Sequence, residues 1–170
     1  MALDTAYSAL LEARCVKESK SGKNMSRIAS LSRWLNGAGK PSLLLYGGYG
    51  TGKTTLMHAT GYALQSFGID YYYKPARFFD DPQNDFSPYR KPSLLMVDEF
   101  GREQEQVNDY GNKSRPLMDV LLYRHDKGYP TVIATNLLID EIGGRYGEYF
   151  LDRLRGGYEM IFYDEKSYRT

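Results

Sequence analysis

One nine-residue stretch constrains the fold more than any other part of the chain. Residues 47–55 read Gly-Gly-Tyr-Gly-Thr-Gly-Lys-Thr-Thr and fit the phosphate-loop pattern GxxxxGK[ST]. An apolar run at residues 43–46 predicts a strand before the loop, and helical spacing begins at Lys53. Such a turn directs backbone N–H groups and the positive end of a helix dipole at one point. A chance glycine turn is the alternative, and the flanking strand and helix favour a phosphate cradle.

We expect the whole loop to hold a nucleotide. Lys53 supplies a charge for the β- and γ-phosphates of ATP, and the Thr54 hydroxyl can bind Mg²⁺. The predicted cofactors are therefore ATP and Mg²⁺. The predicted nucleotide-binding residues are Gly47, Gly48, Tyr49, Gly50, Thr51, Gly52, Lys53, Thr54 and Thr55.

Two carboxylates follow a second apolar run at residues 93–97. Because the carboxyl ends of parallel strands face the ligand in an open sheet, we expect Asp98 beside the phosphate loop as a second Mg²⁺ ligand. Glu99 can then orient and deprotonate the water that attacks the γ-phosphate. A strand followed by an acidic turn is the alternative, and the order of the two half-sites favours an ATPase site.

Size and composition narrow the class of protein. A chain of 170 residues predicts one globular domain, and a net charge of +1 leaves any contact with nucleic acid to a local patch. The single cysteine, Cys15, excludes an internal disulfide and suits a reducing compartment. The sequence shows neither a membrane-length apolar run nor a signal-peptide pattern, so we expect a cytoplasmic protein without membrane contact.

Strands and helices alternate along the chain, which predicts an α/β fold with a parallel sheet and helices on both faces. Residues 101–113 are polar and predict a loop. The predicted strands are residues 43–46, 69–74, 93–99, 131–135 and 158–163. The predicted helices run from Lys53 to a closing Gly68, with Leu56, Ala59, Ala63 and Phe67 on one face, from Pro116 to Gly128, and over residues 139–155 with an interruption at Gly143 and Gly144.

Residues 1–40 form a predicted helical N-terminal arm before a core at residues 41–170. Two helices are expected, separated by a break at residues 19–23. The apolar spacing favours a wrap on the core over a partner-docking arm. The apolar positions are Leu3, Tyr7, Leu10, Leu11 and Cys15 in the first helix and Ile28, Leu31, Trp34 and Leu35 in the second.

The irregular segment at residues 75–92 combines four prolines, aromatic residues and cations. Aromatic rings interleaved with cations can bind single-stranded DNA by stacking on bases and following the backbone. Asp80, Asp81 and Asp85 oppose that attraction, so a solvated loop with packed rings is the favoured alternative. The candidate DNA contacts are Lys74, Arg77, Phe78 and Arg90.

Asn136 follows the predicted strand at residues 131–135. Its amide can hydrogen-bond the γ-phosphate and the attacking water, which makes it a candidate catalytic residue beside Glu99. An N-cap for the helix beginning at Ile139 is the alternative, and for an asparagine in this place it is the favoured one.

From residue 40 to residue 170 the chain resembles the DnaC/IstB group of AAA+ ATPases, which includes replicative helicase loaders and transposition helper ATPases. Residues 162–169 are similar to the end of DnaC, and residues 107–112 to a stretch of related mobile-element ATPases. The matching motifs are the phosphate loop as Walker A, Asp98-Glu99 as Walker B, Thr135-Asn136 as sensor 1 and Leu151-Asp152-Arg153-Leu154 as the arginine-finger element.

The resemblance implies a five-stranded sheet in the order 5-1-4-3-2, without a C-terminal lid domain or its sensor 2 arginine. It also implies a head-to-tail homo-oligomer in which Arg153 is catalytic toward the ATP of the next subunit, with Arg145 as the second candidate. The implied partners are ATP or ADP, single-stranded DNA, and a replicative helicase or transposase. About 40 residues precede the core, fewer than in the helicase-gripping domain of DnaC.

Three functions therefore compete. The first is an oligomeric ATPase in DNA replication or mobile-element transfer, as a helicase loader or transposition helper; the second is a nucleotide-gated adaptor with little hydrolysis; the third is a small-molecule kinase. Glu99 favours the first over the third, because a kinase activates a substrate hydroxyl and needs an arginine-rich lid. A carboxylate shows capacity for hydrolysis without fixing its rate, so the adaptor stays open.

Overall fold

Two buried apolar clusters, one on each face of a five-stranded parallel sheet, organise the fold. The computed structural model describes residues 22–109 and 111–164. The strands lie in the order β2-β3-β6-β1-β7 and all pair in parallel. When these five strands are numbered 1 to 5 along the chain, leaving out the two strands of a separate hairpin, the order read from β7 to β2 is the predicted 5-1-4-3-2. The strands are β1 Ser42–Gly47, β2 Tyr71–Pro75, β3 Leu94–Phe100, β6 Thr131–Thr135 and β7 Tyr158–Tyr163.

The central strands are apolar on both faces because both faces are covered. Leu43 and Leu45 of β1 belong to one cluster, and Leu44 between them belongs to the other. This alternation follows from the two-residue period of a strand. Near-continuous apolar runs are typical of parallel sheets that are covered on both sides.

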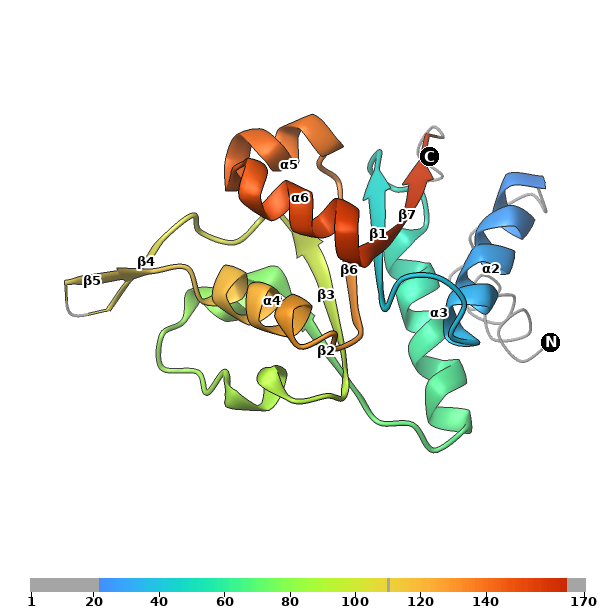
Figure 1. Ribbon diagram of the computed structural model, residues 1–170, viewed down its shortest axis with the longest axis horizontal. Helices are drawn as coiled ribbons and strands as arrows, with labels where there is room; N and C mark the ends of the chain where they lie inside the picture. Colours follow the sequence, from blue (N-terminus) through green and yellow to red (C-terminus); the bar gives the residue numbers. More distant parts are fainter. Residues whose placement is uncertain (1–21, 110, 165–170) are drawn as a thin grey trace.

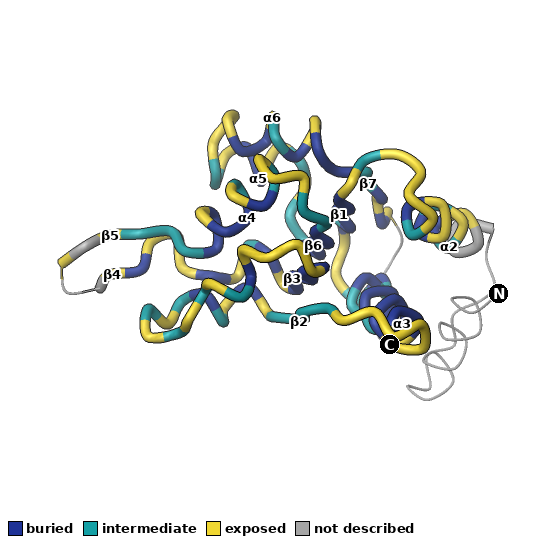
Figure 2. Tube along the Cα trace, turned by 60° about the horizontal axis from the view of Figure 1, so that its bottom comes forward, coloured by how far each residue is buried: buried dark blue, intermediate teal, exposed yellow. Residues whose placement is uncertain are grey.

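Helices cover the two faces unequally (Figure 1). One face carries α2 Gly22–Leu35 and α3 Lys53–Ser66; the other carries α4 Pro116–Asp126, α5 Ile139–Tyr146, α6 Glu148–Gly157 and the 3₁₀ turns η1 Ala76–Asp80 and η2 Ser87–Arg90. Buried positions concentrate on the strands and on the inner sides of these helices (Figure 2). Within the described ranges, none of the helices is long and apolar enough to cross a bilayer.

Helix α2 confirms the prediction that the second N-terminal helix packs on the core. Leu31 is buried, and Trp34 donates from Nε1 to the Pro41 carbonyl at 3.2 Å. The predicted break at residues 19–23 is wrong at its end, because Gly22 and Lys23 are already helical. The first predicted helix lies outside the described residues, as do residues 165–170 of the tail. The division at residue 40 stays a prediction.

An antiparallel hairpin replaces part of the loop predicted at residues 101–113. It is formed by β4 Val107–Asp109 and β5 Asn112–Ser114 and projects from the body on the side away from α2 (Figure 1). Each strand has three residues and little apolar content, so no alternation of side chains could reveal it.

The helix predicted over residues 139–155 is two helices, and its break is at Gly147 rather than at Gly143 and Gly144. Gly147 adopts φ 89° and ψ 159°, which a residue with a side chain rarely reaches. Gly143 lies instead within α5, where an added Cβ would stand 3.0 Å from Leu151 of α6. The prediction that Phe67 lies on the apolar face of α3 is also wrong, because Phe67 is 70% exposed at the end of that helix.

Arg124 of α4 is fully buried at the amino ends of the central strands. Its Nη1 donates to the carbonyls of Tyr89 and Lys91 at 2.7 Å each, and its Nη2 to those of Ser93 at 2.8 Å and Pro130 at 2.6 Å. Burial lowers the pKa of Arg124 to about 10. One guanidinium thus holds the segments that enter β3 and β6.

We predict that Arg124→Met lowers the free energy of unfolding by about 3 kcal/mol, because buried carbonyls lose a charged donor without a replacement. Denaturant unfolding measures this loss of stability as a lower midpoint concentration with an unchanged m-value. The control Arg155→Met removes an exposed arginine and should stay within about 0.5 kcal/mol of the parent. Equal stabilities of the two variants would contradict the prediction.

Candidate nucleotide site

Three neighbouring strands bring the predicted site residues to one edge of the sheet. Asp98 lies near the end of β3, Asn136 follows β6, and the phosphate loop follows β1. These strands are adjacent in the order β3-β6-β1. The edge is thus the crevice in which open parallel sheets place their ligands.

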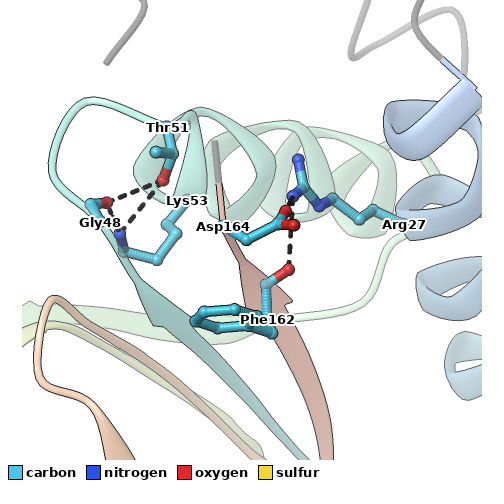
Figure 3. Close-up of polar contacts among 6 residues, drawn as sticks. All are labelled: Arg27, Gly48, Thr51, Lys53, Phe162 and Asp164. Atoms are coloured by element: carbon cyan, nitrogen blue, oxygen red, sulfur yellow. Dashed lines mark hydrogen bonds and ion pairs between the residues drawn. The ribbon is translucent and has the colours of Figure 1, made fainter. Parts of the chain in front are cut away.

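The phosphate loop wraps around the ammonium group of its own lysine (Figure 3). Lys53 Nζ donates to the Gly47 carbonyl at 2.8 Å, to the Gly48 carbonyl at 2.5 Å and to Thr51 Oγ1 at 3.3 Å. Thr51 Oγ1 donates in turn to the Gly48 carbonyl at 2.9 Å. Gly52 has φ 90° and lets the chain turn directly into α3.

The environment of Lys53 disfavours an uncompensated positive charge. Burial lowers the pKa of Lys53 to about 8; the nearby Asp98 raises this pKa, and Arg27 lowers it further. The residue is 6% exposed. A buried cation of this kind gains most from an anion placed beside it, which is what a triphosphate supplies.

The carboxyl end of β7 supports the loop from the other side. Gly48 N donates to the Tyr163 carbonyl at 3.1 Å. An added Cβ at Gly47, where φ is 117°, would stand 2.3 Å from the same oxygen. The loop therefore lies against the main chain of β7, and a side chain at position 47 has no space.

Arg27 of α2 holds that end of β7 and was not identified from the sequence. Its guanidinium lies 4.0 Å from the centre of the Tyr163 ring. It donates to the Phe162 carbonyl at 3.3 Å and forms an ion pair with Asp164 at 3.5 Å (Figure 3). A single arginine on an amphipathic helix carries no local signal, so its role appears once α2 and β7 are placed together.

Asp98 is buried and held by two donors. The backbone N–H of Glu99 donates to its Oδ1 at 2.8 Å, and the Tyr73 hydroxyl donates to its Oδ2 at 2.6 Å. The residue is 5% exposed. Tyr73 is a second residue of the site that the sequence analysis missed, because the contact joins two strands 25 positions apart.

Glu99 sits on an irregularity in β3. The register with β6 shifts between Val97 and Phe100. Among the described non-glycine residues, only Glu99 has a positive φ, at 55°. Bulges and left-handed backbone of this kind are concentrated near functional sites, where they redirect a side chain.

The Glu99 side chain is about half exposed, unlike that of Asp98. Its carboxylate lies 3.9 Å from Arg102 Nη1, and the Arg102 guanidinium lies 6.0 Å from the ring of Tyr49 in the phosphate loop. An ion pair of this length between half-exposed groups contributes about 1 kcal/mol or less. Glu99 is therefore accessible to water and weakly held.

The donor set suits Mg²⁺. Asp98 offers a buried carboxylate, and Thr54 offers a hydroxyl in the first turn of α3. Within the ranges that the structure describes, no cluster of three or more histidine, cysteine, aspartate or glutamate side chains forms a protein cage for a metal. Mg²⁺ at nucleotide sites takes one or two protein oxygens and completes its shell with phosphates and water.

Asn136 is not the cap of the following helix, so the capping alternative is wrong. Leu138 occupies the N-cap position of α5, and its N–H donates to Glu141 Oε2 at 2.6 Å. Thr135 Oγ1 donates to the Phe100 carbonyl at 2.6 Å and accepts the Leu137 N–H at 3.1 Å. These contacts fix the chain on both sides of Asn136, whose amide stays assigned to the site by prediction.

Arg153 and Arg145 differ in how they are engaged. The Arg153 guanidinium lies 3.8 Å from the ring of the exposed Tyr149, and its Nε lies 3.9 Å from an Asp126 carboxylate oxygen without a hydrogen bond. Arg145 donates to the Glu103 carbonyl at 2.5 Å and to the Tyr146 hydroxyl at 3.1 Å.

The network around Arg145 includes the buried Glu103. Glu103 accepts hydrogen bonds from the Gly101 N–H at 2.8 Å and from the Tyr146 hydroxyl. Burial raises the pKa of Tyr146, and the Glu103 carboxylate raises it further. Arg145 is thus part of the support for the chain after β3, whereas Arg153 is the less tightly bound of the two arginines.

The four candidate DNA contacts do not form one cluster. Lys74 Nζ lies 4.3 Å from the centre of the Phe78 ring, and that ring packs edge-on against Phe79, Phe86 and Tyr89. Arg77 donates to the Arg102 carbonyl at 3.1 Å, and Arg90 approaches Tyr123 of α4. The favoured sequence alternative, a segment with packed rings, describes Phe78; Arg77 and Arg90 are exposed.

Comparison with solved structures identifies the fold. The chain superposes on DnaI with a TM-score of 0.69 and 19% identity, covering 89% of this chain and 87% of DnaI. For the DnaC helicase loader the TM-score is 0.67 with 20% identity, covering 86% and 93%. For the replication initiator DnaA bound to AMPPCP and single-stranded DNA it is 0.64 with 17% identity, covering 87% and 48%.

No protein-family profile matches the chain, and no curated protein sequence is significantly similar to it. At identities of 17–20% the structural likeness establishes the fold alone, an α/β fold with a five-stranded parallel sheet like that of DnaI and the DnaC helicase loader. The fold predicted from the resemblance is confirmed. What the chain does has to be argued from its own residues.

Proposed function

We propose that this chain is a Mg²⁺-dependent ATPase that assembles head to tail and acts on single-stranded DNA or on a DNA-bound partner such as a replicative helicase. The observation that carries the proposal is the pairing, at one edge of the sheet, of a buried Lys53 with a buried Asp98 and an accessible Glu99.

Each side chain has a separate task in this proposal. Lys53 and the loop N–H groups bind the β- and γ-phosphates in the ground state. Asp98 and Thr54 would hold Mg²⁺, which supplies neutralisation of phosphate charge when bound. Glu99 accepts a proton from the attacking water as the water oxygen bonds to the γ-phosphorus and the bond from that phosphorus to the bridging oxygen of ADP breaks; Asn136 orients the water. ADP and inorganic phosphate leave.

The competing functions fit this geometry less well. A small-molecule kinase has no use for a water-activating carboxylate at the position of Glu99. A nucleotide-gated adaptor would not need Glu99 on a strained, exposed bulge, although it would need Lys53 and Asp98. The likeness in fold to DnaI and the DnaC helicase loader favours a helicase loader over a transposition helper ATPase. The transposition helper is the next alternative.

We predict that Lys53→Ala abolishes ATP binding, whereas Glu99→Gln binds ATP normally and loses turnover. Lys53 acts on the ground-state phosphates, and Glu99 acts on a water that reacts in the transition state. Calorimetric binding and a phosphate-release assay separate the two effects. Full turnover by Glu99→Gln would refute the catalytic assignment and leave the adaptor hypothesis ahead.

Assembly completes the active site in this proposal. Within its own subunit Arg153 contacts the Tyr149 ring and Asp126. We assign its guanidinium to the γ-phosphate held by the next subunit. Contacts of this heterologous kind produce rings or spirals.

We predict that Arg153→Ala binds ATP but hydrolyses it about 10³-fold more slowly. Arg155→Ala, on the same helix with a more exposed side chain, is the matched control and should keep its activity. Mixing Arg153→Ala with Glu99→Gln should restore activity, because some interfaces then join an intact Glu99 to an intact Arg153. Absence of rescue in demonstrably mixed assemblies would exclude a trans arginine.

The proposed DNA contact also depends on assembly. A subunit with a net charge of +1 holds a polyanion weakly, and several copies along one strand multiply a weak contact. Because Phe78 is packed among other rings, we assign the main contacts to the exposed Arg77 and Arg90.

We predict that Glu99→Gln protein binds a labelled single-stranded oligonucleotide in ATP and much more weakly in ADP, as measured by fluorescence anisotropy. Affinity should fall steeply with salt, because neutralised phosphates release counterions. Arg90→Glu should weaken binding and make the salt slope shallower by about one for each phosphate that is no longer neutralised. Arg33→Glu, an exposed site on α2 at the other end of the sheet, is the control. Negligible binding with both nucleotides would rule out direct binding of DNA.

A further inference from the structure

We propose that Tyr73 is a positioning residue that orients the Asp98 carboxylate toward Mg²⁺. The inference rests on the proposed ATPase function. It assigns a role to a strand residue outside the phosphate loop and the strand-end motifs.

The hydrogen bond between the two side chains is short and partly buried. Tyr73 Oη lies 2.6 Å from Asp98 Oδ2, in the range of charge-assisted O–H···O⁻ bonds. An ionised carboxylate only accepts, so the tyrosine hydroxyl is the donor. Asp98 is 5% exposed, so water competes little for this oxygen.

Two donors hold the Asp98 carboxylate. The torsion that rotates an aspartate carboxylate has broad minima, so an isolated side chain would sample many orientations. Here the Glu99 N–H is bonded to Oδ1 and the Tyr73 hydroxyl to Oδ2. Each oxygen keeps a further lone pair for a metal.

Tyr73 is itself fixed between the two elements that carry the proposed Mg²⁺ ligands. It pairs in register with Met96 of β3, two residues before Asp98. Its ring stacks on that of His58, with centroids 4.8 Å apart and an interplanar angle of 30°. His58 lies one helical turn after Thr54 in α3, on the same side of the helix. One ring therefore sets the carboxylate relative to the helix that carries the hydroxyl ligand.

The adjacent Tyr72 provides a matched control. Successive strand residues point to opposite faces, and Tyr72 packs in the other apolar cluster, against the Tyr89 ring at 5.2 Å. Tyr73→Phe and Tyr72→Phe thus remove the same atom from the same strand, and only Tyr73→Phe removes it from Asp98.

The test is the Mg²⁺ dependence of nucleotide binding, measured at equilibrium with a fluorescent non-hydrolysable ATP analogue. At fixed analogue concentration, Mg²⁺ is titrated into wild-type protein and into each variant. We expect Tyr73→Phe to raise the Mg²⁺ midpoint about tenfold, as removal of a hydrogen-bond partner of a metal ligand does. The affinity of Tyr73→Phe for the analogue in EDTA should equal that of wild type. The Mg²⁺ midpoint of Tyr72→Phe should also equal that of wild type. In an Asp98→Asn background, Tyr73→Phe should have no further effect.

An unchanged midpoint for Tyr73→Phe, or an equal shift for Tyr72→Phe, would overturn the inference and leave the ATPase proposal standing. Failure of wild-type protein to bind the analogue would overturn both. Thermal unfolding checks that each variant is folded. If Tyr73→Phe proves to be unfolded, His58→Ala takes its place, because it removes the stacked ring but keeps the tyrosine hydroxyl. This variant must also raise the Mg²⁺ midpoint, and an unchanged midpoint for it would refute the proposal.

Discussion

The burial of the Lys53 ammonium is the constraint on which the rest of the site depends. A cation taken out of water must be offset by nearby acceptors, and here the loop carbonyls and Asp98 supply them. Those groups come from separate strands, and each is held by a further contact: β7 supports the loop, and β2 supports Asp98. The position of one nitrogen therefore depends on most of the sheet.

The opposite edge of the sheet uses a related arrangement for stability. Arg124 is buried, and its hydrogen-bond partners within the described ranges are main-chain carbonyls and the Thr131 hydroxyl, with no carboxylate among them. A fork of several donors suits this task better than an ammonium, because its planar geometry reaches separate chain segments at once. The two edges thus each contain a buried cation. Lys53 is expected to exchange its carbonyl partners for phosphates, whereas Arg124 holds the chain in place.

The sequence was sufficient to predict those parts of the fold whose signal lies within a short stretch of residues. The phosphate loop, the acidic end of β3 and the alternating strands and helices each lie within short windows, and the strand order followed from the family resemblance. The site contacts made by Arg27 and Tyr73 could not be predicted, because their partners lie 135 and 25 positions away and neither residue type is diagnostic. The β4–β5 hairpin was missed for another reason: its strands are too short and too polar to show the alternation of apolar and polar residues that marks a strand.

The close approach of Gly47 to the Tyr163 carbonyl has an asymmetric effect on the substitutions that the site tolerates. The oxygen belongs to the main chain, so every residue type at position 163 presents it at the same place. Position 47 must stay free of a side chain because of this contact, whereas the same contact makes no demand on the side chain at position 163. That side chain is constrained separately, by its burial in the core and by the Arg27 guanidinium over its ring. In a collection of variants, position 47 should therefore be almost invariant, and substitutions at positions 47 and 163 should show no covariation even though the two residues are in close contact.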